Sequence, residues 1–399
     1  MLTRSSRSAR LGSALAPAVA PAPAPISGGP SESSAAQASP PTPSSRRSVL
    51  AGPLVAGVTF VAALAATHAA GVPLRDPDHV AGRRLLGVAL MVLVLVGLDV
   101  LVRAARRSGT LRPSLDALRS VRRERWSARR GLAMGTAVAS FYVSYLAYRN
   151  LKSVVPLLRP ADLFDSQLAG FDRGLFAGHD PAALLHSLLG TGISAHLLST
   201  VYVFYVVFVP ISLALALVFS LNLPGGLFYA TAMSLSWPLG AASYLLLPAL
   251  GPVYAAPADF AGLPASEASR LQGMLFDDRL EFLRDPAVAG TAQSIAAFAS
   301  VHVSMIFTAA VAAHLLGLGR GVRIGMWVLL ALTATATIYL GWHYVVDDIA
   351  GVGIGVVALA VAGALTGFDL RAGRRVPEEP VEESAHARRT TSRAPGATR

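Results

Sequence analysis

Seven polar residues stand out because their types fit phosphate chemistry and because they lie in three short segments between long apolar runs. They are Lys152 and Arg159, Ser300 and His302, and Thr337, His343 and Asp347. A lysine ammonium is a compact charge and an arginine guanidinium grips two phosphate oxygens, so Lys152 and Arg159 together could hold one phosphate. The alternative for this pair is two basic side chains that extend to a membrane interface from a helix end.

The two histidines are suited to different tasks. His302 follows Ser300 at the start of an apolar run, where an imidazole could protonate a leaving oxygen and the hydroxyl could hold a phosphate oxygen. His343 and Asp347 are four residues apart, so on a helix they would share one face and hydrogen bond, which favours a nucleophilic imidazole. Asp348 is expected on another face, as a helix N-terminal charge. The alternatives are an ordinary interfacial histidine at 302 and an incidental pair at a helix start.

The elements that must position these residues are membrane helices. Of the 399 residues, 53% are hydrophobic and only 14% are charged, and the mean hydropathy is +0.53. Apolar runs of about 20 residues match the thickness of a bilayer core. The net charge of +11 lies mostly in segments that flank these runs, which argues against nucleic-acid binding. The chain has no cysteine, which excludes disulfides and thiolate chemistry.

We predict an all-α, polytopic membrane bundle of about eight transmembrane helices. The expected spans are 49–71, 85–102, 131–149, 197–221, 226–249, 296–317, 324–341 and 349–368. The loop from Arg103 to Arg130 holds ten arginines and is expected to be cytoplasmic. Counting spans from this loop puts both termini in the cytoplasm and all three polar segments on the outer side of the plasma membrane.

Four regions follow from this assignment. They are a disordered tail over 1–48, two accessory spans with the basic loop over 49–130, a catalytic membrane domain over 131–370 and a disordered tail over 371–399. A twin-arginine export signal at Arg46 and Arg47 is an alternative to an ordinary first membrane helix.

Two of the outer segments should have structure of their own. Residues 161–189 have helical spacing typical of a helix at the membrane surface, and 251–295 should form an irregular lid with one helix near 266–284. The surface segment carries four acidic residues that we expect on a solvated face: Asp162, Asp165, Asp172 and Asp180.

The order Lys-x6-Arg-Pro, Ser-x-His and His-x3-Asp resembles the type 2 phosphatidic acid phosphatase (PAP2) superfamily over roughly residues 140–368. Tyr339, Gly341 and Tyr344 around His343, together with the segment 244–254, are most similar to the inositol phosphorylceramide synthase-like branch. The resemblance implies a six-helix core, no metal and no cofactor. The sequence departs from the family pattern at Ala299, Val301, Ala336 and Thr337, and Thr337 stands where the family has a phosphate-binding arginine.

By this resemblance His343 forms a phosphohistidine, Asp347 orients it, and His302 serves as acid and then base. Lys152, Arg159, Ser300 and Thr337 would bind the phosphate. The predicted function is therefore a membrane-embedded phosphatase or phosphotransferase that acts on a lipid phosphate in the bilayer, with transfer to water or to an alcohol left open. The alternatives are a transporter that uses the His/Asp cluster as an ion or proton path, and a non-catalytic lipid-phosphate binder.

Overall fold

The computed structural model describes residues 43–160, 162–220 and 222–370, and all regular secondary structure in these ranges is helical. The predicted tails at 1–42 and 371–399 lie outside the described residues. The long helices of the bundle are α1 (Pro43–Ala69), α2 (Leu85–Ser108), α4 (Ala128–Leu158), α7 (Ile193–Phe219), α8 (Leu223–Leu246), α11 (Val301–Leu315), α12 (Arg320–Tyr339) and α13 (Val345–Thr366).

Each of the eight expected spans coincides with one of these helices, although α1 begins at Pro43, inside the segment predicted as a tail. Five helical segments are long and apolar enough to cross a membrane: Arg46–Ala69, Gly82–Ser108, Ile193–Phe219, Arg320–Tyr339 and Val345–Thr366. The apolar helix α11 is shorter. The all-helical, membrane-type fold is thus confirmed for the described residues, whereas a total of eight spans remains a prediction.

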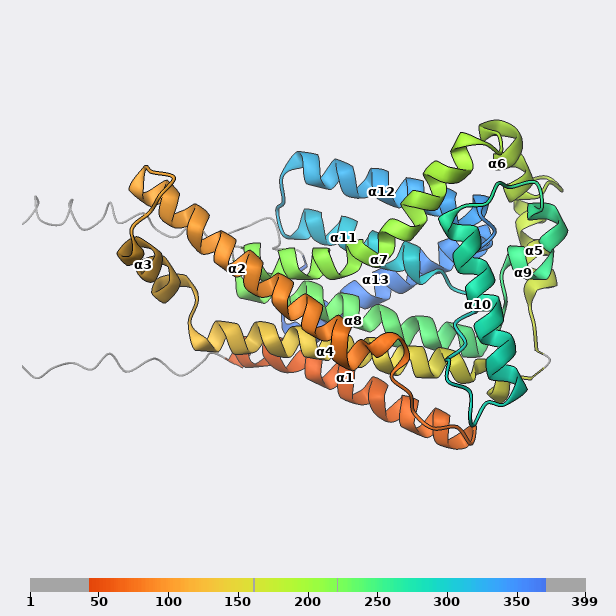
Figure 1. The fold of residues 1–399 in the computed structure, drawn as a ribbon, viewed down its shortest axis with the longest axis horizontal. Helices are drawn as coiled ribbons and strands as arrows, with labels where there is room; N and C mark the ends of the chain where they lie inside the picture. Colours follow the sequence, from red (N-terminus) through yellow and green to blue (C-terminus); the bar gives the residue numbers. More distant parts are fainter. Residues whose placement is uncertain (1–42, 161, 221, 371–399) are drawn as a thin grey trace, which may run out of the picture. The chain divides into compact units, whose positions relative to one another are not determined.

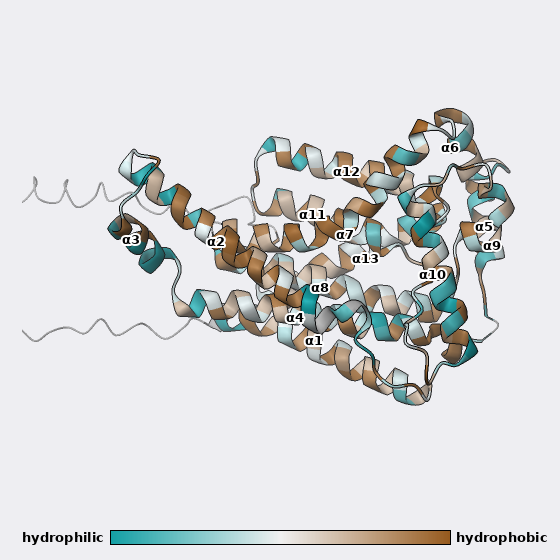
Figure 2. Ribbon diagram, in the orientation of Figure 1, coloured by the Kyte–Doolittle hydropathy of each residue, from teal (hydrophilic) through white to brown (hydrophobic). Residues whose placement is uncertain are grey.

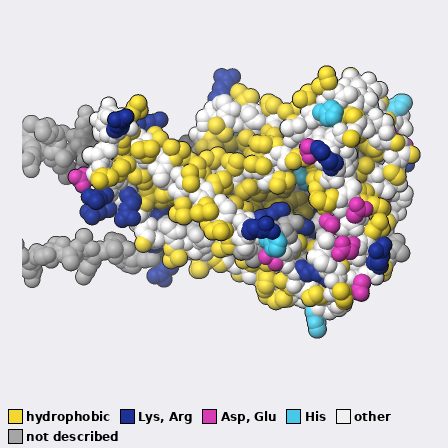
Figure 3. Space-filling model, viewed as in Figure 1, with side chains coloured by type: hydrophobic (Ala, Val, Ile, Leu, Met, Phe, Trp, Pro, Cys, Tyr) yellow, Lys and Arg dark blue, Asp and Glu magenta, His cyan; other side chains and the backbone are white. Residues whose placement is uncertain are grey.

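Polar and apolar side chains are separated along the bundle. Apolar residues dominate the middle of α1, α2 and α12, and hydrophilic residues concentrate in α3 (Leu115–Arg125) and in the elements at the opposite end (Figure 2). On the face seen in Figure 3, acidic side chains gather mainly at the end that carries α5 and α10. Exposed leucines and valines of α1 and α2, such as Leu54 and Val94, suit a lipid environment.

The non-membrane elements other than α3 gather at one end of the bundle (Figure 1). The surface segment forms α5 (Asp165–Leu175) and α6 (Pro181–Leu189). The lid segment between α8 and α11 forms α9 (Pro252–Ala255), a short 3-10 helix (Pro257–Phe260) and α10 (Glu267–Arg284), the helix that we expected near 266–284. Ser266 caps the start of α10, and the Arg75 guanidinium ties the lid to the α1–α2 connection by donating to the Pro286 carbonyl at 2.6 Å. A 3-10 turn (Pro77–His79) and a π-helical turn (Val80–Arg84) complete that connection.

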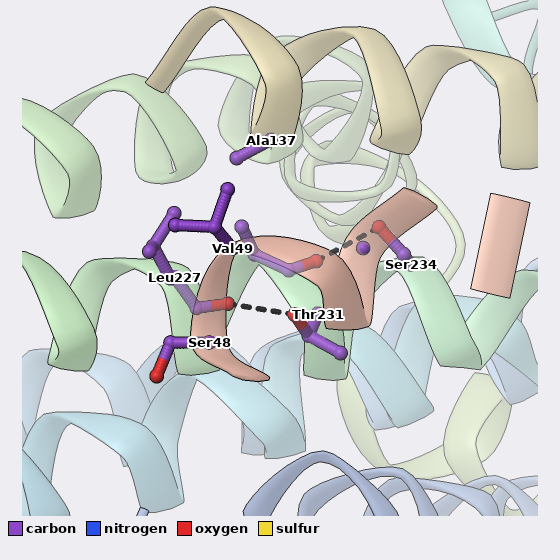
Figure 4. A pocket seen from close by; sticks show the side chains of 8 residues that line it. Ser48, Val49, Ala137, Leu227, Thr231 and Ser234 are labelled. Carbon is purple, nitrogen blue, oxygen red and sulfur yellow. Dashed lines mark hydrogen bonds between the residues drawn. The ribbon is translucent and has the colours of Figure 1, made fainter. Parts of the chain in front are cut away.

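Small residues allow the helices of the bundle to approach closely. Helix α1 packs on α4 and α8, and only a void of about 10 Å³ remains among Ser48, Gly52, Ala137, Thr231 and Ser234 (Figure 4). The hydroxyls of the last two bond to carbonyls of their own helix, Leu227 and Ala230, so polar side chains are satisfied inside an apolar interface (Figure 4).

The start of α11 closely approaches α13. A methyl group built on Gly351 would lie 2.4 Å from the Ser300 carbonyl oxygen, whereas one built on Gly353 would meet nothing within 4 Å. The Ser300 amide also donates to the Asp347 carbonyl at 3.0 Å. Glycine at 351 is therefore required for this contact, and glycine at 353 is not.

Gly351→Ala should lower the stability of the folded protein by about 1–3 kcal/mol, because the added methyl group must displace backbone. Thermal unfolding in detergent would measure the loss. The matched control is Gly353→Ala on the same helix, which should melt near the wild type. Equal melting temperatures for the two variants would contradict the close contact of α11 with α13.

Candidate functional site

The predicted chemical residues come from four helix ends that meet at the end of the bundle beside α5, α9 and α10 (Figure 1). Lys152 lies in the last two turns of α4, and Arg159 is the C-cap of that helix. Ser300 is the N-cap of α11, and His302 lies in its first turn. Thr337 lies near the end of α12, and His343 precedes the start of α13.

The two histidines are neighbours. The centroids of the His302 and His343 rings are 6.0 Å apart and the rings are tilted by 59°. The contact between α11 and α13 brings the two rings together, because the hydrogen bond from the Ser300 amide to the Asp347 carbonyl fixes the start of α11 against the first turn of α13. Residues 41 positions apart in sequence are thus within reach of one phosphoryl group.

The pairing of His343 with Asp347 arises differently from our expectation. His343 lies in the turn before α13, so the two residues do not share a helical face. Asp347 instead reaches back from the first turn: its carboxylate accepts from the Tyr344 amide at 3.0 Å and lies 3.4 Å from Nδ1 of His343. The carboxylate therefore caps α13 and orients the imidazole at the same time.

The structure corrects the prediction that Asp348 is simply a charge at the N-terminus of a helix. It is only 6% exposed, and its carboxylate accepts a hydrogen bond from the Thr337 hydroxyl at 2.9 Å. The Ser300 side chain lies beside the same carboxylate, and His343 is within its electrostatic reach. The same hydroxyl lies 2.8 Å from the Ala334 carbonyl of its own helix, so its one proton is shared between that carbonyl and Asp348. The sequence did show a second acidic residue directly after Asp347, but the direction of its side chain depends on the fold.

The first motif contributes its two cations in different ways. The Lys152 ammonium lies over the Tyr244 ring, 4.8 Å from the centroid, and its charge acts on both imidazoles. Arg159 donates to Asp162 at 2.8 Å and to the Leu245 carbonyl at 2.6 Å, and it faces a cavity of about 230 Å³. The sequence pair thus separates into a lysine at the histidines and an arginine at the cavity.

Aromatic rings enclose His302 within the bundle. Tyr202 and Tyr205 of α7 lie 4.6 and 4.0 Å from its ring, centroid to centroid, and Tyr202 stacks on Trp342 at 4.7 Å. Such walls fix the imidazole and exclude water from it. The sequence alone gave no sign that α7 contributes to the site.

Two acidic residues of the surface segment are buried, contrary to the expectation of a solvated face. Asp172 of α5 is 2% exposed and accepts from the Val345 and Val346 amides at 2.6 and 3.1 Å. It therefore caps α13 from outside and stabilises the turn that carries His343. Burial raises the pKa of Asp172, and these two amide bonds oppose that rise.

Asp165, at the start of α5, has the same kind of role. Its carboxylate accepts from the amides of Leu250 and Gly251 and, at 3.1 Å, from the Tyr344 hydroxyl. The surface segment is thus bonded to the lid and to the His343 turn. The part of the chain that the structure describes contains no group of histidine and acidic side chains able to hold a metal ion.

The electrostatic environment keeps His343 neutral. Burial lowers the pKa of His343 from 6.5 to about 4; the charge of Lys152 adds to this shift, and the Asp348 carboxylate opposes it. A neutral imidazole carries the lone pair that a nucleophile requires. The site is therefore a neutral imidazole, a second imidazole and an ammonium group, held at one end of an apolar bundle.

Fold and site together define an all-helical, membrane-type protein with a two-histidine site at one end of the bundle. The sequence model of the PAP2 superfamily matches residues 166–361. This match includes His302, His343 and both aspartates but begins after Lys152 and Arg159, whose place at the site comes from the structure. The match supports the resemblance to this superfamily over just under half of the chain, and it suggests a phosphatase or phosphotransferase. No curated protein and no solved structure matches the chain.

Selective histidine labelling and NMR titration should give His343 a midpoint near pH 4. Lys152→Met should raise this midpoint by removing a positive charge, and Asp348→Asn should lower it. Because the pKa of the folded state lies below the unfolded value of about 6.5, stability should fall as the pH drops from about 6.5 toward 4. A midpoint near 6.5 in the wild type would contradict the buried environment.

Proposed function

We propose that this protein is a metal-independent phosphatase or phosphotransferase that acts on a lipid-linked phosphate through a phosphohistidine. The observation that carries the proposal is the 6.0 Å separation of the His302 and His343 rings beside the Lys152 ammonium. One imidazole can attack phosphorus while the other serves the oxygen that leaves, and the ammonium offsets charge on the phosphoryl oxygens.

In the first half-reaction, a ring nitrogen of His343 forms a bond to phosphorus as the bond from phosphorus to the lipid oxygen breaks. His302, protonated, gives its proton to that oxygen, so the alcohol leaves neutral. In the second half-reaction His302 takes a proton from water or from an alcohol, whose oxygen attacks phosphorus and releases His343. Water gives a phosphatase, and a lipid or polyol hydroxyl gives a phosphotransferase.

The two aspartates support the charge that builds up on His343. Once phosphorylated, the imidazole ring is positive, and Asp347 lies 3.4 Å from Nδ1 in the ground state. Asp348 adds a second buried carboxylate that Thr337 holds in place. Preorganised carboxylates stabilise this charge without reorganising during the reaction.

A lipid substrate is favoured because the site lies at one end of apolar helices, level with the lid and the surface helices (Figure 1). A phosphate at the interface could enter while its hydrocarbon chain stays in the bilayer. The ten-arginine loop from Arg103 to Arg130 lies at the other end, and we infer that this end and both termini are cytoplasmic and the site faces outward across the plasma membrane. The likeness to the inositol phosphorylceramide synthase-like branch leads us to include alcohols among the acceptors.

His343→Gln should reduce turnover of lipid phosphate by at least about 10³-fold, because the nucleophile is lost. The assay would offer phosphatidate, polyprenyl phosphate and phosphatidylinositol to purified protein and would score both free phosphate and transferred product. The matched control is His314→Gln, at the other end of α11, where the imidazole bonds to Trp327. Unchanged turnover in the His343 variant would overturn the mechanism, as would full loss of activity with a metal chelator.

His302→Gln should slow turnover about 10²- to 10⁴-fold for lipid phosphates, whose alcohol leaving groups need a proton. The loss should shrink for a nitrophenyl phosphate ester, because that leaving group departs without protonation. Measuring both substrates for both histidine variants separates the roles: only the His302 defect should depend on the leaving group. An equal dependence in the two variants would contradict the assignment of the acid.

A further inference from the structure

A second arginine faces the cavity that Arg159 lines. This arginine is Arg279, in the middle of the lid helix α10, and the cavity has a volume of about 230 Å³. The rest of its lining is apolar and comes from the end of α4, the segment after α8, α10 and the segment before α11: Val155, Pro156, Pro160, Leu163, Pro248, Ala249, Leu250, Leu283, Ile295 and Ala296. Two guanidinium groups thus share a mostly apolar space.

Arg279 is also linked to the backbone of Lys152 through Gln293, which is fully buried. Its guanidinium donates to the Gln293 Oε1 at 3.2 Å, and the Gln293 side-chain amide donates to the Lys152 carbonyl at 2.8 Å. Gln293 therefore fixes α10 against the turn of α4 that carries the ammonium group. The backbone of Ala297, four residues further on, bonds to Ala249 and lies beside His343.

The Arg279 guanidinium is partly buried, and its hydrogen-bond partner carries no negative charge. The hydrogen bond to Gln293 is long, and the acceptor is a neutral amide oxygen. Burial lowers the pKa of Arg279, and the nearby Asp165 opposes that shift. A partly desolvated guanidinium with unused donors gains from an anion in the adjoining cavity.

We propose that Arg279 is a phosphate-binding residue of this same site, which with Arg159 holds the phosphate of a lipid-linked substrate in the cavity below the lid. This inference rests on the proposed function and adds a second arginine to the phosphate-binding residues. The ligand class is a phosphate ester on an apolar chain, because two guanidinium groups suit the phosphate and the remaining lining suits hydrocarbon.

Arg279→Met should raise the KM for a lipid phosphate about 10- to 100-fold, the loss expected for charge-assisted hydrogen bonds, with kcat changed much less. Arg279→Lys should recover part of the loss, since it restores the charge but not the planar fork. The matched control, Arg284→Met, removes an exposed arginine at the end of the same helix and should leave KM unchanged.

Binding without turnover separates this inference from the proposed function. In a His343→Gln background, protection of the protein against thermal unfolding would be measured with inorganic phosphate and, separately, with vesicles that contain phosphatidate. We expect Arg279→Met to weaken protection by both ligands, and a loss for inorganic phosphate alone would overturn the lipid-linked substrate. If the wild-type protein shows no turnover of any lipid phosphate but binding still depends on Arg279, the catalytic function is refuted and this site is retained.

If Arg279→Met turns over lipid phosphate with an unchanged KM and unchanged binding, the proposed phosphate site at Arg279 is overturned. The proposed phosphatase or phosphotransferase function is retained in that case. If Arg279→Met does not fold, Arg279→Lys decides, because it keeps the charge and the long stem. An unchanged KM in that variant would count against recognition by the guanidinium fork. A fall in melting temperature with normal KM would assign Arg279 a structural role through Gln293 and would also overturn the proposal.

Discussion

The site depends on how closely α11 and α13 approach each other. The Ser300 carbonyl lies where any side chain at residue 351 would have its Cβ atom, and the Ser300 amide bonds to the Asp347 carbonyl. These contacts fix the first turn of α11 against the first turn of α13. Since His302 lies in the first turn of α11 and His343 lies just before α13, backbone proximity, rather than any direct bond between the two rings, sets their distance.

Around this contact, carboxylates hold the His343 turn from several directions. Asp347 caps the turn from within α13, Asp172 caps it from α5, and Asp165 reaches it through the Tyr344 hydroxyl. A buried carboxylate is costly unless amides or hydroxyls satisfy it. Each of the three accepts hydrogen bonds from groups of the turn or its neighbours, although the buried Oδ1 of Asp347 has no hydrogen-bond partner among the described residues. The network stabilises one arrangement of His343.

The lid and the membrane helices make different contributions to one site. The helices supply the imidazoles and Lys152 in an environment that keeps His343 neutral. The lid adds Arg279 and closes a cavity with apolar walls beside Arg159. This division is suited to a substrate with a charged head and an apolar tail, because the two ends need different surroundings.

The sequence by itself determined the membrane-type helical fold, because apolar runs of bilayer length are a property of local composition. It also identified the candidate chemical residues, since Lys152, Arg159, His302 and His343 are polar groups in segments that could otherwise be apolar. The tertiary structure decided which carboxylates matter. Asp348 and Asp172 differ from solvent-facing acids only by what packs against them, and spacing along a chain does not encode that. The same reason explains Arg279: one arginine among many becomes a candidate ligand only when folding brings it to a cavity 120 residues away from Arg159 along the chain.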